Sequence, residues 1–360
     1  MTAAAGLTPV QAARRADRRR RLRRPSALLK LAALVALALV PVVVPSFQVL
    51  DLALKVALFG TLVASYDVLI GYTGIVSFGH AMFFGIGAYA VGLALGRFGA
   101  ATYTSLAAGF AAGVVVAAVL AFVIGAFSLR VKAIFFAMIT LAFAEFALIL
   151  AVQLSALTGG EDGVSPRLPG VFALDWAARP LGVPLTGRHV TYYAVLALCA
   201  VLFLAMSRFV ASPLGRTLQA IRDNELRAEA LGYRTFVFQS IASSFASVVA
   251  TLLGGAYVMW VRYVNPDSTL GIHIMLDILL MVIIGGIGTL DGGIIGAAVL
   301  LTAQTLLPNL RAAGAALFPG AELAQRLTDR WLLYFGVMFI LVVFFFPRGV
   351  IGTLRRSSPR

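Results

Sequence analysis

Long apolar runs alternate with short polar segments along almost the whole chain. A transmembrane helix needs about 20 predominantly apolar residues, with a range of about 17–25. Segments of this length, or close to it, lie near 28–45, 47–70, 75–95, 105–128, 133–157, 190–207, 236–261, 271–285, 293–308 and 331–346. The pattern predicts an all-α polytopic membrane protein with about ten transmembrane helices, some of them broken by Gly-rich segments.

The positive charges predict which loops face the cytoplasm, because Arg and Lys are enriched in cytoplasmic loops. Ten spans place both termini on the same side. With the N-terminus inside, Arg130, Lys132 and the loop 208–234 all fall in the cytoplasm. We therefore expect a cytoplasmic loop and an external loop within one transmembrane domain, flanked by cytoplasmic ends. The expected boundaries are 1–26 for a basic N-terminal extension, 27–347 for the transmembrane domain, 211–234 for the cytoplasmic loop, 158–189 for the external loop and 348–360 for the tail.

Composition agrees with a membrane protein. The chain is 61% hydrophobic and 12% charged, whereas soluble domains carry about 25% charged residues. The net charge is +14, and eight arginines lie between Arg14 and Arg24. A basic run can indicate nucleic-acid binding. This one adjoins the apolar run 28–44, so it is more typical of a topology anchor that also contacts lipid headgroups, and we expect no nucleic-acid partner.

The segment from Gly71 to His80 interrupts two apolar runs with three glycines and several polar side chains. Irregular backbone at membrane depth persists only where protein or a water-filled cavity satisfies its polar groups. Transporters often place a substrate path at such breaks. We predict that the substrate pathway includes Asp67, Tyr72, Thr73, Gly74, Ser77, Phe78, Gly79 and His80.

A second Gly-rich segment echoes the first. Residues 69–74 read LIGYTG, and residues 283–288 read IIGGIG. Paired broken segments in two halves of a chain are typical of transporter repeats. The spacing does not divide the ten spans into five and five, so the echo indicates at most a partial repeat.

The cytoplasmic loop 211–234 predicts two short helices. Apolar residues recur at helical spacing, Asp223 or Asn224 is suited to cap a second helix, and Gly232 is a natural stop. The apolar side would pack on the bundle or a partner, and the charged side would meet a soluble protein, unless the loop is simply a solvated interfacial helix. The apolar positions are Leu214, Leu218, Ile221, Ala228 and Leu231, and the charged positions are Arg216, Arg222, Glu225, Arg227 and Glu229.

Four landmarks together resemble one family. GRTLQAIRDNELRAEALG at 215–232 resembles the ATPase-coupling loop of ABC importer permeases of the branched-chain amino acid type, with Glu229 and Ala230 followed by Gly232 at its core. GYTGIVSFGHAMFFGIGAYA at 71–90, TGGEDGV at 158–164 and FFPRGVIG at 345–352 resemble further signatures of the same family. Their order and the long external loop resemble the LivM-type subunit more than its shorter LivH-type partner. The external turn departs from the family pattern in having Glu161 beside Asp162.

The resemblance implies a non-catalytic permease subunit of the bacterial inner membrane. Its implied partners are two ABC ATPase subunits, a LivH-type second permease, an extracytoplasmic solute-binding protein and the lipid bilayer. ATP would be bound by the partner subunits, so we expect no cofactor, catalytic residue or metal site here. None of the three lysines follows a glycine, as a phosphate-binding loop requires. The implied ATPase-coupling residues are Gly215, Arg216, Arg222, Asp223, Glu225, Glu229, Ala230 and Gly232.

Other functions stay open at this point. An ABC permease for urea or short amides shares these signatures. A proton-coupled secondary transporter would use Asp67, Glu145 and Asp277 as a relay, since ionisable groups inside a membrane are expensive and often functional. A polytopic membrane enzyme would need a cluster of catalytic residues at one interface, and the sequence contains no recognisable motif of that kind.

Overall fold

The computed structural model describes residues 25–44, 46–97, 101–128, 133–174, 176–178, 185–307, 331–346 and 349–356. Most of the basic extension and the positions of Arg130 and Lys132 lie outside the described residues. The chain forms two compact units, residues 1–53 and 54–360. The first unit contains helix α2 (Pro25–Val43) and the first turns of helix α3 (Phe47–Ile70).

The second unit is built mainly from helices. Each predicted apolar segment of the chain overlaps one of the observed helices, but the segment predicted at 75–95 begins too early, because residues 75–79 are non-helical. Beyond α3, the long helices are α4 (His80–Gly96), α5 (Tyr103–Ser128), α6 (Ala133–Gln153), α8 (Gly187–Ala211), α11 (Thr235–Val261), α13 (Ile272–Gly285), α14 (Leu290–Leu306) and α17 (Trp331–Phe345).

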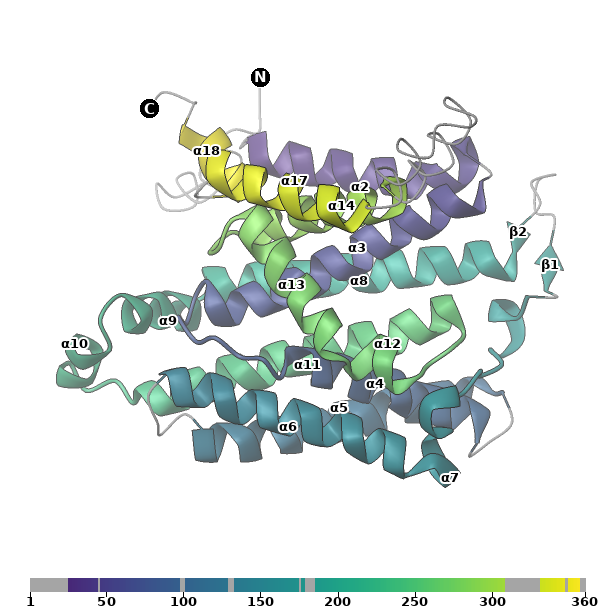
Figure 1. The fold of residues 1–360 in the computed structure, drawn as a ribbon, viewed down its shortest axis with the longest axis horizontal. Helices are drawn as coiled ribbons and strands as arrows, with labels where there is room; N and C mark the ends of the chain where they lie inside the picture. The colour runs from purple at the N-terminus through teal and green to yellow at the C-terminus, as the bar shows by residue number, and fades with distance from the viewer. Residues whose placement is uncertain are drawn as a thin grey trace, which may run out of the picture. The chain divides into compact units, whose positions relative to one another are not determined.

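Short elements connect these helices. Within the second unit, the loop helices α9 and α10 lie at one end of the long helices, and the hairpin β1–β2 lies toward the other end (Figure 1). The short elements are α7 (Ser155–Thr158), η1 (Gly160–Asp162), η2 (Gly170–Phe172), β1 (Ala177–Ala178), β2 (Leu185–Thr186), α9 (Pro213–Asp223), α10 (Glu225–Ala230), α12 (Pro266–Leu270) and α18 (Gly349–Arg356).

The lengths and compositions of the helices identify the fold as that of a membrane protein. Among the described residues, seven helical stretches are long and apolar enough to cross a bilayer, and three shorter apolar helices accompany them. α12 and α13 together form one of the seven, and α17 runs into α18 in another. The prediction of an all-α polytopic membrane protein is therefore confirmed.

Glycine allows the long helices to approach one another closely. A Cβ atom added to Gly87 of α4 would lie 1.8 Å from the carbonyl oxygen of Thr251 in α11, and one added to Gly254 would lie 1.8 Å from that of Phe84. The Thr251 hydroxyl donates a hydrogen bond to the Phe83 carbonyl across the same contact, at 3.0 Å. Small residues and interhelical hydrogen bonds are the usual means of helix association in lipid, where the hydrophobic effect contributes little. The α4–α11 pair is thus a tightly packed unit.

The same principle joins α14 to two neighbours. A Cβ added to Gly296 would lie 1.8 Å from the carbonyl oxygen of Met281 in α13. One added to Gly293 would lie 2.8 Å from the backbone nitrogen of Ala64 in α3. α14 therefore holds the end of α3 close to the end of α13.

We predict that Gly254→Ala destabilises the protein. The added methyl group meets the backbone of α4, and overpacking of this kind costs roughly 1–3 kcal/mol, although alanine is otherwise the better helix residue by about 0.5–1 kcal/mol. Gly336 in α17 is the matched control, since no described atom lies within 4 Å of its added Cβ. Thermal unfolding of the detergent-purified variants should show a lower Tm for Gly254→Ala and an unchanged or higher Tm for Gly336→Ala. An unchanged Tm for Gly254→Ala would contradict the tight α4–α11 contact.

Candidate functional site: the glycine junction and the α9–α10 loop

After α3 the chain turns back into the bundle. Residues 71–79 are non-helical, with a positive φ of 76° at Gly74. α4 then begins at His80, whose Nε2 atom lies 2.8 Å from the hydroxyl oxygen of Ser65. Ser65 lies five residues before the end of α3, which is about 8 Å along a helix. Residues 71–79 are therefore a re-entrant segment, and α4 starts inside the bundle rather than at its edge.

Protein groups satisfy the backbone of the re-entrant segment. The Phe78 amide donates to the hydroxyl of Thr140 in α6 at 3.0 Å, and the Gly79 amide donates to the Ser77 hydroxyl at 3.3 Å. The Thr73 hydroxyl donates to the Leu69 carbonyl at 2.5 Å. The first two bonds satisfy backbone amides of the segment, as irregular backbone away from water requires. The polar side chains of the segment are thus engaged within the protein.

Asp67 joins the re-entrant segment to the second glycine-rich segment. Its carboxylate, 1% exposed, accepts a hydrogen bond from the Gly288 amide at 2.7 Å. A Cβ added to Gly71 would lie 2.3 Å from the same carboxylate oxygen and 2.5 Å from the Gly288 nitrogen. The Asp67 carboxylate therefore bonds the backbone of the second break, more than 200 residues further along the chain.

Gly349 of the C-terminal motif FFPRGVIG packs against the second glycine-rich segment. Gly349 has a positive φ of 73°, and a Cβ added there would lie 2.2 Å from the Gly286 Cα atom. Only glycine fits this backbone-to-backbone contact. We call Asp67, Gly71, Gly286, Gly288 and Gly349 the glycine junction.

The α9–α10 loop has a defined cap at each helix end. The Ser212 hydroxyl accepts from the Gly215 amide at 3.2 Å and caps α9, and the Asn224 side chain accepts from the Arg227 amide at 2.9 Å and caps α10. Gly232 has a φ of 89°, and the amides after α10 bond back to the carbonyls of Ala228 and Glu229 in a Schellman motif. The structure thus has the two expected helices, with Asn224 rather than Asp223 as the cap.

The loop buries one set of apolar residues and exposes another. Leu218, Ile221 and Ala228 are buried, as the stripe predicts. Leu231 is 72% exposed and Leu226 is 80% exposed, so of the two expected contacts for Leu231, with the bundle or with a partner, packing on the bundle does not occur. The extended backbone at Asn224 resets the helical phase between α9 and α10. The solvent-facing surface of α10 is therefore partly apolar rather than only charged.

Two acidic residues of the loop are tied to α11. The Glu229 carboxylate accepts from the Thr235 hydroxyl at 2.8 Å, and the Glu225 carboxylate accepts from the Gln239 amide at 3.3 Å. A carboxylate near the start of α11 is also favoured by the helix dipole. Both residues hold α10 against α11, while Arg216 and Ala230 are exposed.

Arg222 faces the junction. Its Nη1 donates to the Gly71 carbonyl, and its Nε and Nη2 donate to the Asp223 carboxylate at 3.2 and 3.0 Å. A Cβ added to Gly74 would lie 2.9 Å from Arg222 Cγ. The side chain thus lies along the re-entrant segment.

The predicted pathway residues lie together around the re-entrant segment, and their role in a pathway stays a prediction. Asp67, Thr73, Ser77, Gly79 and His80 are buried, Tyr72 and Phe78 are half-buried, and Gly74 is exposed. Sequence reasoning missed Ser65, Thr140 and Gly288 as their partners. Of these, Gly288 was detectable, because it belongs to the echo of the first glycine segment.

The candidate relay residues are not gathered into one site. Asp277 accepts from the side-chain amide of Gln304 in α14 at 3.2 Å, whereas Asp67 bonds Gly288. Glu145 is half-buried on α6 and has no hydrogen-bond partner among the described residues. No group of three or more His, Cys, Asp or Glu residues capable of holding a metal occurs in the described part of the chain.

The backbone geometry of the turn at 158–164 explains why its motif is rich in glycine. Gly159, Gly160 and Gly163 all have positive φ. Val164 pairs with Val264 as an antiparallel bridge, and a Cβ added to Gly163 would lie 2.2 Å from the Val264 carbonyl oxygen. The turn thus packs against the chain that leads from α11 into α12.

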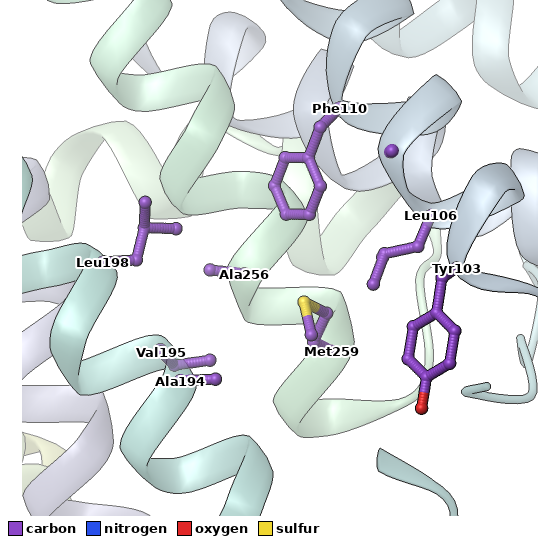
Figure 2. Close-up of a pocket in the computed structure, with 9 residues that line it drawn as sticks. Tyr103, Leu106, Phe110, Ala194, Val195, Leu198, Ala256 and Met259 are labelled. Atoms are coloured by element: carbon purple, nitrogen blue, oxygen red, sulfur yellow. The ribbon is translucent and has the colours of Figure 1, made fainter. Parts of the chain in front are cut away.

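Two pockets of the described residues are apolar and lie away from the junction. One of about 290 Å³ lies between α5, α8 and α11, and Figure 2 shows Phe110, Leu198 and Met259 around it. Another of about 320 Å³ lies between α4, α5, α6 and α12. Their linings suit hydrocarbon better than a zwitterion, whose charged groups need polar partners.

A multi-pass helical bundle with a re-entrant segment and a capped two-helix loop has the architecture of a membrane permease subunit. The family described as the branched-chain amino acid transport system / permease component matches residues 48–343. The chain belongs to this family, and it is a non-catalytic, multi-pass permease component of the inner membrane.

Individual relatives agree with the family match. The high-affinity branched-chain amino acid transport system permease protein LivM of Escherichia coli is 26% identical over 91% of this chain and 75% of its own length. The LivM protein of Salmonella typhimurium is 26% identical over 85% of this chain and 70% of its own length. A probable LivM protein of Methanocaldococcus jannaschii is 24% identical over 78% of this chain and 86% of its own length. No solved structure matches the chain.

We predict that Asp67→Ala is more damaging than Asp67→Asn. Alanine leaves the half-buried Gly288 amide without its acceptor, which costs roughly 1–3 kcal/mol, whereas asparagine keeps an acceptor oxygen of the same reach. The Tm of the purified variants should fall for Asp67→Ala and fall less for Asp67→Asn. Equal losses for the two variants would mean that the charge, and not the hydrogen bond, holds the junction.

Proposed function

We propose that this chain is the LivM-type permease subunit of an ATP-driven importer for branched-chain amino acids. The capped α9–α10 loop carries the proposal, because its exposed apolar side chains form a surface that a soluble partner would cover. The names of the relatives support the substrate class. The proposed complex also contains two ATPases, a LivH-type permease and an external solute-binding protein.

The proposed orientation has ten spans and both termini in the cytoplasm. The basic loop residues favour this side by the positive-inside rule. The contact of Arg222 with Gly71 supports it, because it requires the α9–α10 loop and the end of α3 to share one membrane face. The re-entrant segment and the break at 286–289 then open toward the cytoplasm.

The proposed mechanism is alternating access driven by ATP in the partner subunits. Closure of the ATPases moves the α9–α10 loop, and the bundle exposes its pathway first outward and then inward. A ligand shifts such an equilibrium only if its affinity differs between the two states. The residues 71–80 would contribute the polar part of the pathway.

The test is purification from the native membrane followed by reconstitution. We expect two ATPases and a second permease to co-purify with the tagged chain. Proteoliposomes that contain the complex, its binding protein and internal ATP should then accumulate labelled leucine. Accumulation of urea or short amides instead of leucine would contradict the proposed substrate class. Uptake by the chain alone under a proton gradient would indicate a secondary transporter rather than an ATP-driven importer.

We predict that Leu226→Asp combined with Leu231→Asp weakens ATPase docking. Both side chains are exposed in the isolated chain, so the change should leave the Tm unchanged while it removes apolar contact area in the complex. Quantitative co-purification should show ATPase recovery reduced by about tenfold, the effect of about 1.4 kcal/mol. Arg208→Ala, at an exposed position near the end of α8, is the control and should retain the ATPases. Full ATPase recovery with the double variant would indicate that α9 and α10 are only a solvated interfacial helix pair.

A further inference from the structure

The last turn of α9 lies against both glycine breaks. Arg222 Nη1 donates to the Gly71 carbonyl at the start of the re-entrant segment. The same nitrogen lies 3.7 Å from the position that a Cβ of Gly288 would occupy. One guanidinium therefore meets the segment after α3 and the segment between α13 and α14.

The side-chain stem of Arg222 fits against Gly74. The three atoms nearest to a Cβ added there all belong to Arg222, at 2.9, 3.7 and 3.9 Å. The glycine has no side chain to keep the arginine away, and its positive φ bends the chain at this point. The loop and the re-entrant segment thus touch through both a hydrogen bond and a close packing contact.

The two partners of this contact differ in rigidity. α9 is capped by Ser212 and anchored by the buried Leu218 and Ile221, so Arg222 moves with its helix. Residues 74–79 of the re-entrant segment are non-helical, and they lead directly into α4. A displacement of α9 would therefore shift the segment before it shifted the glycine-packed α4–α11 pair.

We propose that Arg222 is a positioning residue that transmits movement of the α9–α10 loop to the re-entrant segment 71–79. Arg222 was grouped with the residues that meet the ATPase, but its guanidinium contacts the permease's own backbone. This inference rests on the proposed function, since it assigns a role within ATP-driven coupling. Arg222 and Gly74 then move together during the transport cycle.

The first test separates ATPase docking from transport in the reconstituted complex. Arg222→Ala should leave ATPase recovery and ATP hydrolysis nearly unchanged, while solute uptake per ATP falls by about tenfold, as for the loss of one hydrogen bond from a charged donor. Arg222→Lys keeps a donor and should recover part of the uptake. Arg208→Ala, exposed and near the end of α8, is the matched control. Unchanged uptake per ATP in Arg222→Ala would overturn the proposal.

The second test replaces the contact with a covalent bond. A Cβ at position 74 would lie 3.7 Å from that of residue 222, and disulfides have Cβ–Cβ separations of about 3.5–4.5 Å. In a Cys199→Ser background, Arg222→Cys with Gly74→Cys should be uncoupled when reduced and should regain uptake when oxidised. Each single variant should fail to respond to the oxidant.

The outcomes distinguish this inference from the function on which it rests. Blocked uptake in the oxidised double variant would show that the loop and the segment must separate, and would overturn the proposal. Normal uptake in the reduced double variant would show that the contact is dispensable, with the same consequence. If the double variant does not fold, the Arg222→Ala and Arg222→Lys pair decides alone. Failure of ATPases to co-purify with the unaltered chain would instead contradict the proposed function.

Discussion

A buried carboxylate organises the centre of this protein. Irregular backbone inside a membrane bundle has no water to bond, so each break in a helix needs a partner from the protein itself. Asp67 provides one for the Gly288 amide, and in doing so it holds the end of α3 against the break between α13 and α14. The re-entrant segment, the last turn of α9 and the C-terminal Gly349 all pack around this bond or beside it. The positions of these segments follow from the need to give a few backbone amide and carbonyl groups a hydrogen-bond partner.

Glycine plays two different parts in this fold. In the α4–α11 and α13–α14 contacts it brings regular helices close together, which makes rigid pairs. At Gly74, Gly288 and Gly349 its positive φ allows the chain to turn where other residues would be strained. The rigid pairs and the turning points alternate along the chain. This division leaves the backbone between α3 and α4 as a place where a movement can occur without disturbing the packed helices.

Much of the architecture was determined by the sequence itself. The apolar runs predict all of the long helices, because a segment in lipid must satisfy its own backbone and this makes length and hydropathy sufficient signals. Local chemistry also predicts the two helices of the loop, since a capping Asn224 and a terminating Gly232 act within a few residues of themselves. The echo between residues 69–74 and 283–288 indicated a relation between the breaks, but not that they are in contact.

Only the tertiary structure decided which distant groups meet. The bonds from Asp67 to Gly288, Phe78 to Thr140 and Arg222 to Gly71 join residues that are 62 to 221 positions apart. No local sequence pattern encodes such pairs. The helix propensity of an aspartate or an arginine is the same whether its side chain faces solvent or another helix. The outward positions of Leu226 and Leu231 were likewise undetermined, since a single extended residue between α9 and α10 sets their phase. The sequence determined the helices and their ends, and the packing determined the site.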